Sequence, residues 1–237
     1  MTDTQGNQIS WFRAWDLLWE KVSDYFGDIA GKSAVLPNGG YSDAMDGVQE
    51  RLRPCLERYG FRGRGRNFTR KTPEGLTQVI NFQIGPWGGG GKFTVNAGVF
   101  IPEVYEAVEG KKLRSQVSII HCSKIERIGM LASRRMDVWW PVKNRSSILA
   151  DVEGRIQNHV LPFLARFETR ASCLGQFTTF ELWKDRTEAV LLKGLGRSVE
   201  AKAILVSALR LASQRGNTDY AQSLRQVAAR LELQDVH

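Results

Sequence analysis

Hydrophobic and polar residues change their spacing along the chain, and the change separates helical from extended stretches. Behind Ser10, a residue type that caps helices, apolar side chains recur at helical spacing and predict a helix from Trp11 to Phe26. Residues 31–40 follow as a glycine-rich linker. A second helix is expected after Ser42, with Gly60 supplying its C-terminal stop.

Strand-like patterns fill the middle of the chain. The candidate strands, in chain order, are 67–71, 76–84, 93–101, 116–122 and 136–140. The turn sequence Thr72-Pro73-Glu74-Gly75 joins the first two into a hairpin. The basic stretch Lys124–Arg135 is expected to be a loop or a short helix. Together these elements predict an α+β fold, in which an antiparallel sheet of about five strands carries helices on one face.

From Ser147 the pattern is helical to the end, with a kink or stop at Pro162. Three more helices are expected in a C-terminal tail, at 177–194, 198–213 and 218–231. Gly196, Ala201 and Ala208 have the small-residue spacing of a tetratricopeptide-like hairpin, which ordinary helix packing explains equally well. The chain thus divides into an N-terminal amphipathic helix with its linker (1–40), an α+β core domain (41–168) and a helical tail (169–237).

The net charge of +8 is distributed unevenly. Residues 1–50 hold three basic and eight acidic side chains, whereas residues 51–101 hold nine basic and two acidic ones. Such asymmetry can steer an anionic partner towards the basic part. It is equally consistent with an acidic N-terminal segment that lies against the basic surface of its own chain or of a neighbour.

A basic run between residues 51 and 71 leads into the hairpin, and its candidate binding residues are Arg62, Arg64, Arg66 and Arg70. In one interpretation these arginines contact phosphates while Trp87 or Phe68 stacks on a base. In the other they form a solvated strand edge that discourages aggregation, or they pair with the acidic N-terminal helix. No helix-turn-helix, zinc-finger or ribonucleoprotein motif accompanies them.

Polar side chains mark the strands after the hairpin. Asn81, Gln83 and Asn96, together with Thr94, lie on the faces opposite the apolar rows. They form either a polar binding face or the wet side of a half-exposed sheet, which is the commoner arrangement. If they are buried, each amide needs hydrogen-bond partners, because an unpaired one costs about 1–3 kcal/mol.

Trp11, Trp15 and Trp19 stand one turn apart on the first predicted helix and form a large apolar stripe. A stripe of this size must be covered. Either the rest of the chain packs over it, or the stripe binds a partner protein or a second copy of the chain.

Residues suited to catalysis or metal binding are few. The three cysteines and three histidines lack zinc-ligand spacing, and neighbouring His121 and Cys122 would point to opposite faces of a strand. Asp43, Asp46 and Glu50 share one side of the second helix near its start, where the helix dipole alone favours acids; a metal or acid–base role is the alternative. We therefore expect no cofactor and no metal, and we favour a non-enzymatic protein, with an enzyme as the third alternative.

The chain shows no feature of export or membrane insertion. Its polar N-terminal residues lack a signal-peptide pattern, and no apolar run approaches the length of a membrane span. An odd number of scattered cysteines fits a reducing compartment. These observations predict a cytoplasmic protein.

Several blocks of sequence resemble a bacterial family, catalogued as domain of unknown function 4304. The most specific blocks are Val79-Ile80-Asn81-Phe82-Gln83 and Phe93-Thr94-Val95-Asn96. The others are Tyr41–Met45, Gly60–Arg70, Cys122 with Arg127-Ile128-Gly129, Trp139-Trp140 and Leu161-Pro162-Phe163. The resemblance covers roughly residues 41–167. It supports the fold prediction, and it implies no activity, cofactor or catalytic residue.

Two functional hypotheses follow from these patterns. The first is a cytoplasmic, non-enzymatic bacterial protein that binds a protein partner or itself. Its more specific form is an accessory or immunity-type role in bacterial conflict or phage defence. The alternative is a nucleic-acid-binding protein that uses the arginine-rich hairpin.

Overall fold

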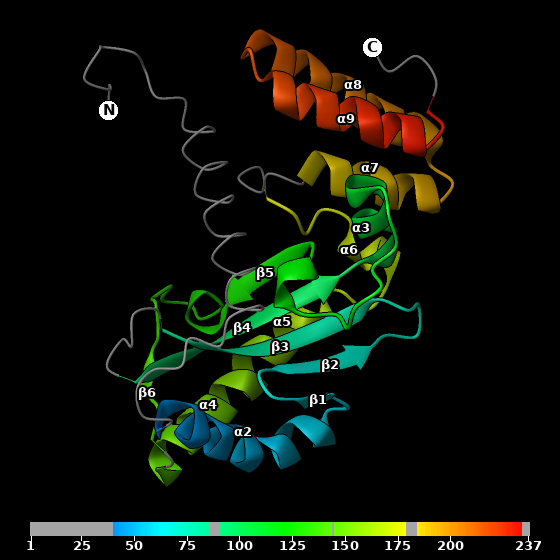
Figure 1. Ribbon diagram of the computed structural model, residues 1–237. Coiled ribbons are helices and arrows are strands. Elements are labelled where there is room, and N and C mark those ends of the chain that lie inside the picture. Colours follow the sequence, from blue (N-terminus) through cyan, green and yellow to red (C-terminus); the bar gives the residue numbers. More distant parts are fainter. Residues whose placement is uncertain (1–39, 86–90, 144, 179–183, 234–237) are drawn as a thin grey trace, which may run out of the picture. The chain divides into compact units, whose positions relative to one another are not determined.

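The structure is a computed structural model that describes residues 40–85, 91–143, 145–178 and 184–233 (Figure 1). Residues 41–237 form one compact unit. The predicted helix from Trp11 to Phe26, with Trp11, Trp15 and Trp19, lies outside the described residues, and so does Trp87.

An antiparallel sheet lies at the centre of this unit. Its strands are β1 (Arg62–Arg64), β2 (Asn67–Lys71), β3 (Thr77–Ile84), β4 (Lys92–Phe100), β5 (Lys124–Arg127) and β6 (Trp140–Pro141). The first five lie side by side in chain order, and β6 pairs with the start of β4 (Figure 1). The long pair β3 and β4 is in register from Thr77 opposite Phe100 to Ile84 opposite Phe93. The predicted α+β fold with an antiparallel sheet is confirmed.

Two predicted strands differ from the structure. Residues 116–122 contain a 3-10 turn, η1 (Ile119–His121), in which the Ser118 N–H donates to His121 Nδ1 at 3.1 Å. Such local bonds between side chain and backbone compete with strand pairing. The predicted strand at 136–140 is reduced to β6. The expected loop or short helix 124–135 instead holds β5 and a second 3-10 turn, η2 (Ile128–Met130), because β5 pairs with β4 across the sheet.

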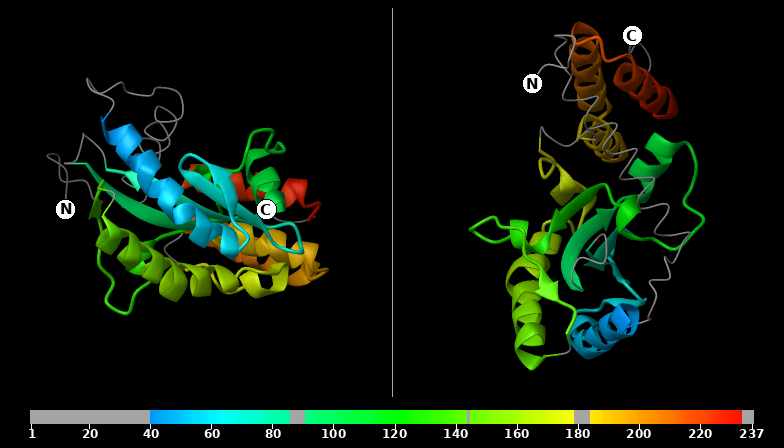
Figure 2. Two further views of the ribbon diagram at one scale, coloured as in Figure 1. Left: turned by 90° about the horizontal axis from the view of Figure 1, so that it is seen from below. Right: turned by 60° about the vertical axis from the view of Figure 1, so that its left-hand side comes forward.

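Two helical segments pack on one face of the sheet, as predicted (Figure 2). The first is α2 (Gly40–Arg58), after which Gly60 takes a left-handed φ of 81°. The second runs through α4 (Ser146–Arg155), η3 (Ile156–Val160) and α5 (Leu161–Ala165). The buried core between them joins Met45, Val48, Leu52, Leu149, Val152, Ile156 and Phe163 to Phe68, Ile80, Phe82 and Val95 of the strands.

Pro162 bends the second helical segment without ending it. The five residues of η3, immediately before α5, form a π-helical turn. Proline supplies no N–H and its ring crowds the preceding turn, so a wider turn accommodates it while the chain stays helical. The short α6 (Arg170–Cys173) follows, and the side chains of Thr169 and Ser172 cap its first turn.

The C-terminal tail consists of α7 (Lys184–Gly194), α8 (Ser198–Gln214) and α9 (Thr218–Arg230). The bounds of α8 and α9 are close to the predicted ones, whereas residues 177 and 178, at the start of the predicted first tail helix, are not helical. A second core of small and branched residues holds them together: Ala189, Leu192, Ala201, Leu205, Ala208, Leu209, Ala221 and Leu224. The tail is attached to α3 (Pro102–Glu109), because Arg230 donates to the carbonyls of Ala107 and Val108 at 2.7 and 2.8 Å.

Candidate functional site

A row of polar residues crosses the sheet on the face opposite α2 and α4. The strand register aligns Asn67 of β2 with Asn81 of β3, Asn96 of β4 and Arg127 of β5. Residues in register on neighbouring antiparallel strands share a face, so their side chains are neighbours. We call Asn67, Asn81 and Asn96 the asparagine row. In β1, Arg64 occupies the register position beside Asn67.

The asparagine row forms a hydrogen-bonded chain. Asn96 Nδ2 donates to Asn81 Oδ1 at 3.3 Å, and Asn81 Nδ2 donates to Asn67 Oδ1 at 3.0 Å. Asn96 Nδ2 also donates to Gln83 Oε1 at 3.0 Å. Asn81 and Asn96 are only 8% and 6% exposed, so these amides are buried and paired with each other. We expected a half-exposed, solvated sheet face as the commoner arrangement. In the structure, this face is buried at Asn81 and Asn96.

Thr94 of β4 belongs to the same polar face and lies opposite Gln83 of β3. It is fully buried, and its Oγ1 has no hydrogen-bond partner among the described residues. Buried hydroxyls without partners are uncommon, since each forfeits its hydrogen bonds to water. The alternating pattern places Thr94 and Asn96 on the same face, so it does not predict that Asn96 is hydrogen-bonded while the Thr94 hydroxyl is not.

Arg127 ends the polar row in an arrangement that the sequence did not reveal. Its Nη1 donates to both carboxylate oxygens of Asp137, at 2.8 and 2.9 Å, and its guanidinium lies 5.1 Å from the centroid of the Trp139 ring. Trp139 Nε1 donates to Asp137 as well. Burial raises the pKa of Asp137, but the hydrogen bonds from Arg127 and Trp139 outweigh it and hold the pKa below its usual value. The charge of Arg127 is therefore balanced inside the molecule.

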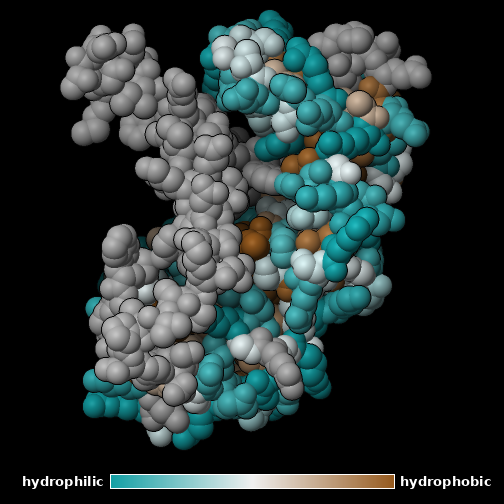
Figure 3. Space-filling model, viewed as in Figure 1, coloured by the Kyte–Doolittle hydropathy of each residue, from teal (hydrophilic) through white to brown (hydrophobic). Residues whose placement is uncertain are grey.

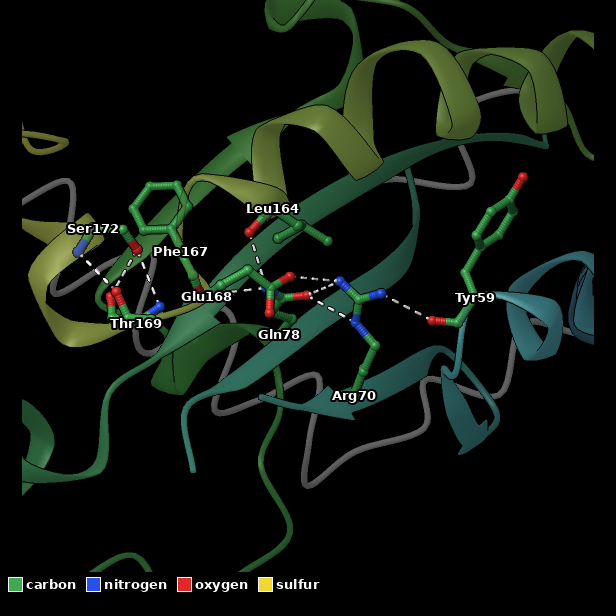
Figure 4. A network of polar contacts seen from close by, with 8 residues as sticks. All are labelled: Tyr59, Arg70, Gln78, Leu164, Phe167, Glu168, Thr169 and Ser172. Carbon is green, nitrogen blue, oxygen red and sulfur yellow. Dashed lines mark hydrogen bonds and ion pairs between the residues drawn. The ribbon is translucent and has the colours of Figure 1, made fainter. Parts of the chain in front are cut away.

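Arg70, one of the four candidate arginines, is held between the sheet and the helices (Figure 4). Its Nε and Nη2 donate to Gln78 Oε1 at 3.0 and 2.6 Å. Nη1 donates to the Tyr59 carbonyl, and Nη2 forms an ion pair with Glu168 at 3.2 Å. Every nitrogen of the Arg70 guanidinium thus has a partner within the chain, which leaves little capacity for a ligand.

Gln78 connects this arginine to the end of α5 (Figure 4). The side chain is fully buried, and its Nε2 donates to the carbonyls of Leu164 at 2.9 Å and Phe167 at 3.3 Å. The last carbonyls of a helix lack partners within the helix, so a side-chain donor here satisfies them. The contacts of Gln78 and Arg70 serve the fold.

Arg62 and Arg66 lie at the exposed edge of the β1–β2 hairpin. Arg62 Nη1 donates only to backbone carbonyls, those of Glu57 and Phe61, at 3.0 and 3.1 Å. Within the described ranges, no carboxylate lies within ion-pair distance of either guanidinium. The structure thus divides the predicted site: Asn81, Gln83 and Asn96 meet inside, Arg62 and Arg66 stay at the edge, and Arg70 faces the helices.

Groups that could act in catalysis are in unreactive surroundings. Burial raises the pKa of the Cys55 and Cys122 thiols, and it raises that of Cys173 to about 12. Glu50 accepts hydrogen bonds from Arg53, which lower its pKa. In the part of the chain that the structure describes, no cluster of three or more histidine, cysteine or acidic side chains is placed to hold a metal ion.

Residues 52–166 match the sequence model of DUF4304, a domain of unknown function. The matched stretch is a little less than half of the chain, and we call it the DUF4304 domain. The match confirms the resemblance seen in the sequence, and the DUF4304 domain contains the whole sheet, the asparagine row and Arg127. No curated protein and no solved structure matches the chain. Among the described helices of the protein, none combines the length and the apolar character needed to cross a bilayer.

The Gln78 contacts lead to a stability prediction. Gln78→Leu leaves the Leu164 and Phe167 carbonyls and the Arg70 guanidinium without their shared partner, and should lower the free energy of unfolding by roughly 2–4 kcal/mol. Urea unfolding followed by tryptophan fluorescence measures the change. Gln116→Leu, at an exposed glutamine, is the matched control and should change stability by less than about 0.5 kcal/mol. Equal stability of the two variants would contradict this role.

His121 gives the turn at η1 a dependence on pH. Because Ser118 N–H donates to Nδ1, the ring must be neutral for this bond to form. The ring also packs edge-on against Tyr105, with centroids 5.9 Å apart. Burial lowers the pKa of His121, and the Glu109 carboxylate opposes only part of that shift. Protonation therefore costs more in the folded chain than in the unfolded chain.

The sign of the pH effect follows from linkage. The unfolded chain takes up the His121 proton at a higher pH than the folded chain, so the free energy of unfolding should fall as pH drops below the ordinary value of 6.5. His121→Asn keeps an acceptor but cannot titrate, and should flatten the curve between about pH 6.5 and pH 5. Denaturant titrations across this range test it, with His159→Asn as the control that leaves the His121 turn intact. A His121→Asn curve as steep as the wild-type curve would refute the assignment.

Proposed function

We propose that this protein is a non-enzymatic binding protein that acts through protein–protein contacts, including contacts between its own copies. One observation carries the proposal: the outer side of α8 exposes an apolar stripe. Val199 is 83% exposed and Val206 is 40% exposed, with exposed Ala203 between them. Leu195, in the turn that precedes α8, is 38% exposed.

The spacing makes this stripe more than a set of isolated surface residues. Positions 199, 203 and 206 follow helical spacing and fall on one side of α8. The opposite side, with Ala201, Leu205 and Ala208, is already buried against the neighbouring helices. A helix with apolar residues on both sides is typical of an inner layer, so the exposed side suits a further protein layer. On the face drawn in Figure 3, the described surface is mostly hydrophilic and its apolar patches are small.

The chemistry of the DUF4304 domain supports binding rather than catalysis. Carboxamides of the asparagine row do not titrate near neutral pH, and burial raises the pKa of the two thiols of the domain, Cys55 and Cys122. Unpaired cysteines support a cytoplasmic location. Within this class, we retain the accessory or immunity-type role in a bacterial cell as the specific form of the proposal.

Charging the stripe should abolish association. Val199→Asp with Val206→Asp places two carboxylates on the apolar surface, where a partner would have to desolvate them. We expect the full chain, purified gently from its native cells, to show a complex or oligomer by light scattering, and we expect the double variant to be monomeric. Ser213→Asp with Gln214→Glu adds the same charge to exposed polar positions of α8 and should associate like the wild type.

Two results would contradict the proposed function. One is a wild-type chain that remains monomeric and free of bound protein under these conditions. The other is an identical complex in the wild type and in the Val199→Asp, Val206→Asp variant, which would leave the stripe without a role.

Nucleic-acid binding is the second candidate, and it has one specific observation in its favour. Arg62 and Arg66 are exposed at the hairpin and have no carboxylate at ion-pair distance in the described parts of the chain. Exposed guanidinium groups without a paired carboxylate are suited to phosphates. Arg70, by contrast, cannot contribute without giving up Gln78 and Glu168.

The salt dependence of binding tests this candidate. If Arg62 and Arg66 each contact one phosphate of a labelled single-stranded oligonucleotide, replacing both by Ala should reduce the slope of log K against log salt by about 1.4. Arg51→Ala, which removes an exposed charge from α2, should leave the slope unchanged. Binding that is absent at low salt, or a slope indifferent to both arginines, would dispose of the candidate.

A further inference from the structure

A groove of about 370 Å³ lies where the end of β4 meets α3 and the loop that follows it. Phe100, Pro102, Leu113 and Val117 supply its apolar surface, and Glu106, Lys112 and Ser115 supply its polar groups. We call these seven residues the α3 groove. The α3 groove lies within the DUF4304 domain and on a different element from the apolar stripe of α8.

The loop that supplies Lys112 and Leu113 to the α3 groove is basic. Lys111, Lys112 and Arg114 fall within four residues of the loop, and all three are exposed. In the described portion of the protein, none of them has a carboxylate at ion-pair distance. Glu106 is the one acidic residue that lines the groove. The groove therefore combines apolar lining residues with a loop that carries excess positive charge.

Two sets of contacts hold Phe100 and α3, which line the α3 groove, in place. The Phe100 ring packs against Tyr105, with centroids 5.7 Å apart, and Tyr105 packs against His121. On the other side, Arg230 binds the last carbonyls of α3, and Gly110 has a left-handed φ of 72° there. A Cβ at Gly110 would come within 2.6 Å of the Arg230 guanidinium, so the close approach requires glycine. Such support gives a preformed surface, which lowers the entropic cost of binding.

We propose that the α3 groove binds an acidic segment of a partner protein, which inserts one apolar side chain between Phe100 and Leu113. The inference rests on the proposed function and names the chemistry of the partner. A volume of about 370 Å³ is at the small end of ligand pockets, which run from roughly 300 to 1,000 Å³, and suits a side chain rather than a large cofactor. Carboxylates on either side of that anchor would meet Lys112 and Arg114.

An acidic peptide fits this surface better than a nucleic acid does. A phosphate backbone would satisfy the lysines and Arg114, but it would leave the apolar floor of Phe100, Leu113 and Val117 exposed to water. A segment with an apolar anchor covers the apolar lining residues, and its carboxylates neutralise the cations of the loop. Burial of the anchor supplies affinity, and the charges supply orientation and specificity.

The test uses the full chain and a phage-displayed library of random 12-residue peptides. Enriched peptides should carry one large apolar residue flanked by Asp or Glu. Their affinities are then measured by fluorescence anisotropy against three variants: Lys112→Glu with Arg114→Glu, Leu113→Asp, and the control Lys71→Glu with Lys143→Glu. The control changes the net charge by the same amount at exposed lysines outside the α3 groove.

We expect the Lys112→Glu, Arg114→Glu variant to bind at least about tenfold more weakly and the control variant to bind like the wild type. Leu113→Asp should also lose binding, and its unfolding midpoint shows whether it folds. Because Lys112 and Arg114 are exposed, their variant keeps the test decisive even if Leu113→Asp is unstable.

Several outcomes would overturn the inference: no enrichment, enriched peptides without acidic residues, or equal binding to all the variants. Another outcome is that peptides bind the groove variants as tightly as the wild type but do not bind the Val199→Asp, Val206→Asp variant. This result would support protein binding through α8 and refute the α3 groove as a binding site. Failure of the α8 experiment together with an absence of enriched peptides would count against both proposals.

Discussion

Gln78 holds the two layers of the DUF4304 domain together through one buried carboxamide. Its oxygen accepts from Arg70 in the neighbouring strand, and its nitrogen donates to the carbonyls of Leu164 and Phe167 where α5 ends. Each of these groups is costly to bury alone, so the sheet and the helical segment satisfy each other's polar groups only in one relative position. Apolar packing between the layers is larger in area, but it would tolerate small shifts that this network does not.

The opposite face of the same strands carries a second polar constraint, the asparagine row. A slip of one residue between β3 and β4 would turn Asn81 or Asn96 towards the apolar core and break the hydrogen bond between them. Because Gln78 and Asn81 lie on opposite faces of β3, the register of this strand is fixed from both sides. These contacts explain how a polar sheet centre can be buried with its carboxamides hydrogen-bonded to one another.

Local signals account for what the sequence predicted well. The stop at Gly60, the turn at Pro73 and Gly75, and the periodic apolar residues of α7 to α9 are all set by near neighbours in the chain. In contrast, β5 pairs with β4 where the sequence predicted a loop or a short helix, because no local pattern announces that pairing. The candidate arginines show the same limit. Arg62 and Arg70 look equivalent in the sequence, yet the strand register leaves one at the exposed edge and puts the other against Gln78 and Glu168.

The tail lies outside the DUF4304 match, but its packing reaches the α3 groove. Arg230 of α9 places a cation at the C-terminal end of α3, where the helix dipole favours positive charge, and Gly110 lets the guanidinium approach the backbone. Because α3 supplies Pro102 and Glu106 to the groove, the tail supports one of its walls. The same tail exposes the apolar stripe of α8. The opposite side of α8 packs on α9 through Leu205 and Leu224. The two proposed binding surfaces therefore stand on one set of packed helices, in which α9 contacts both α3 and α8.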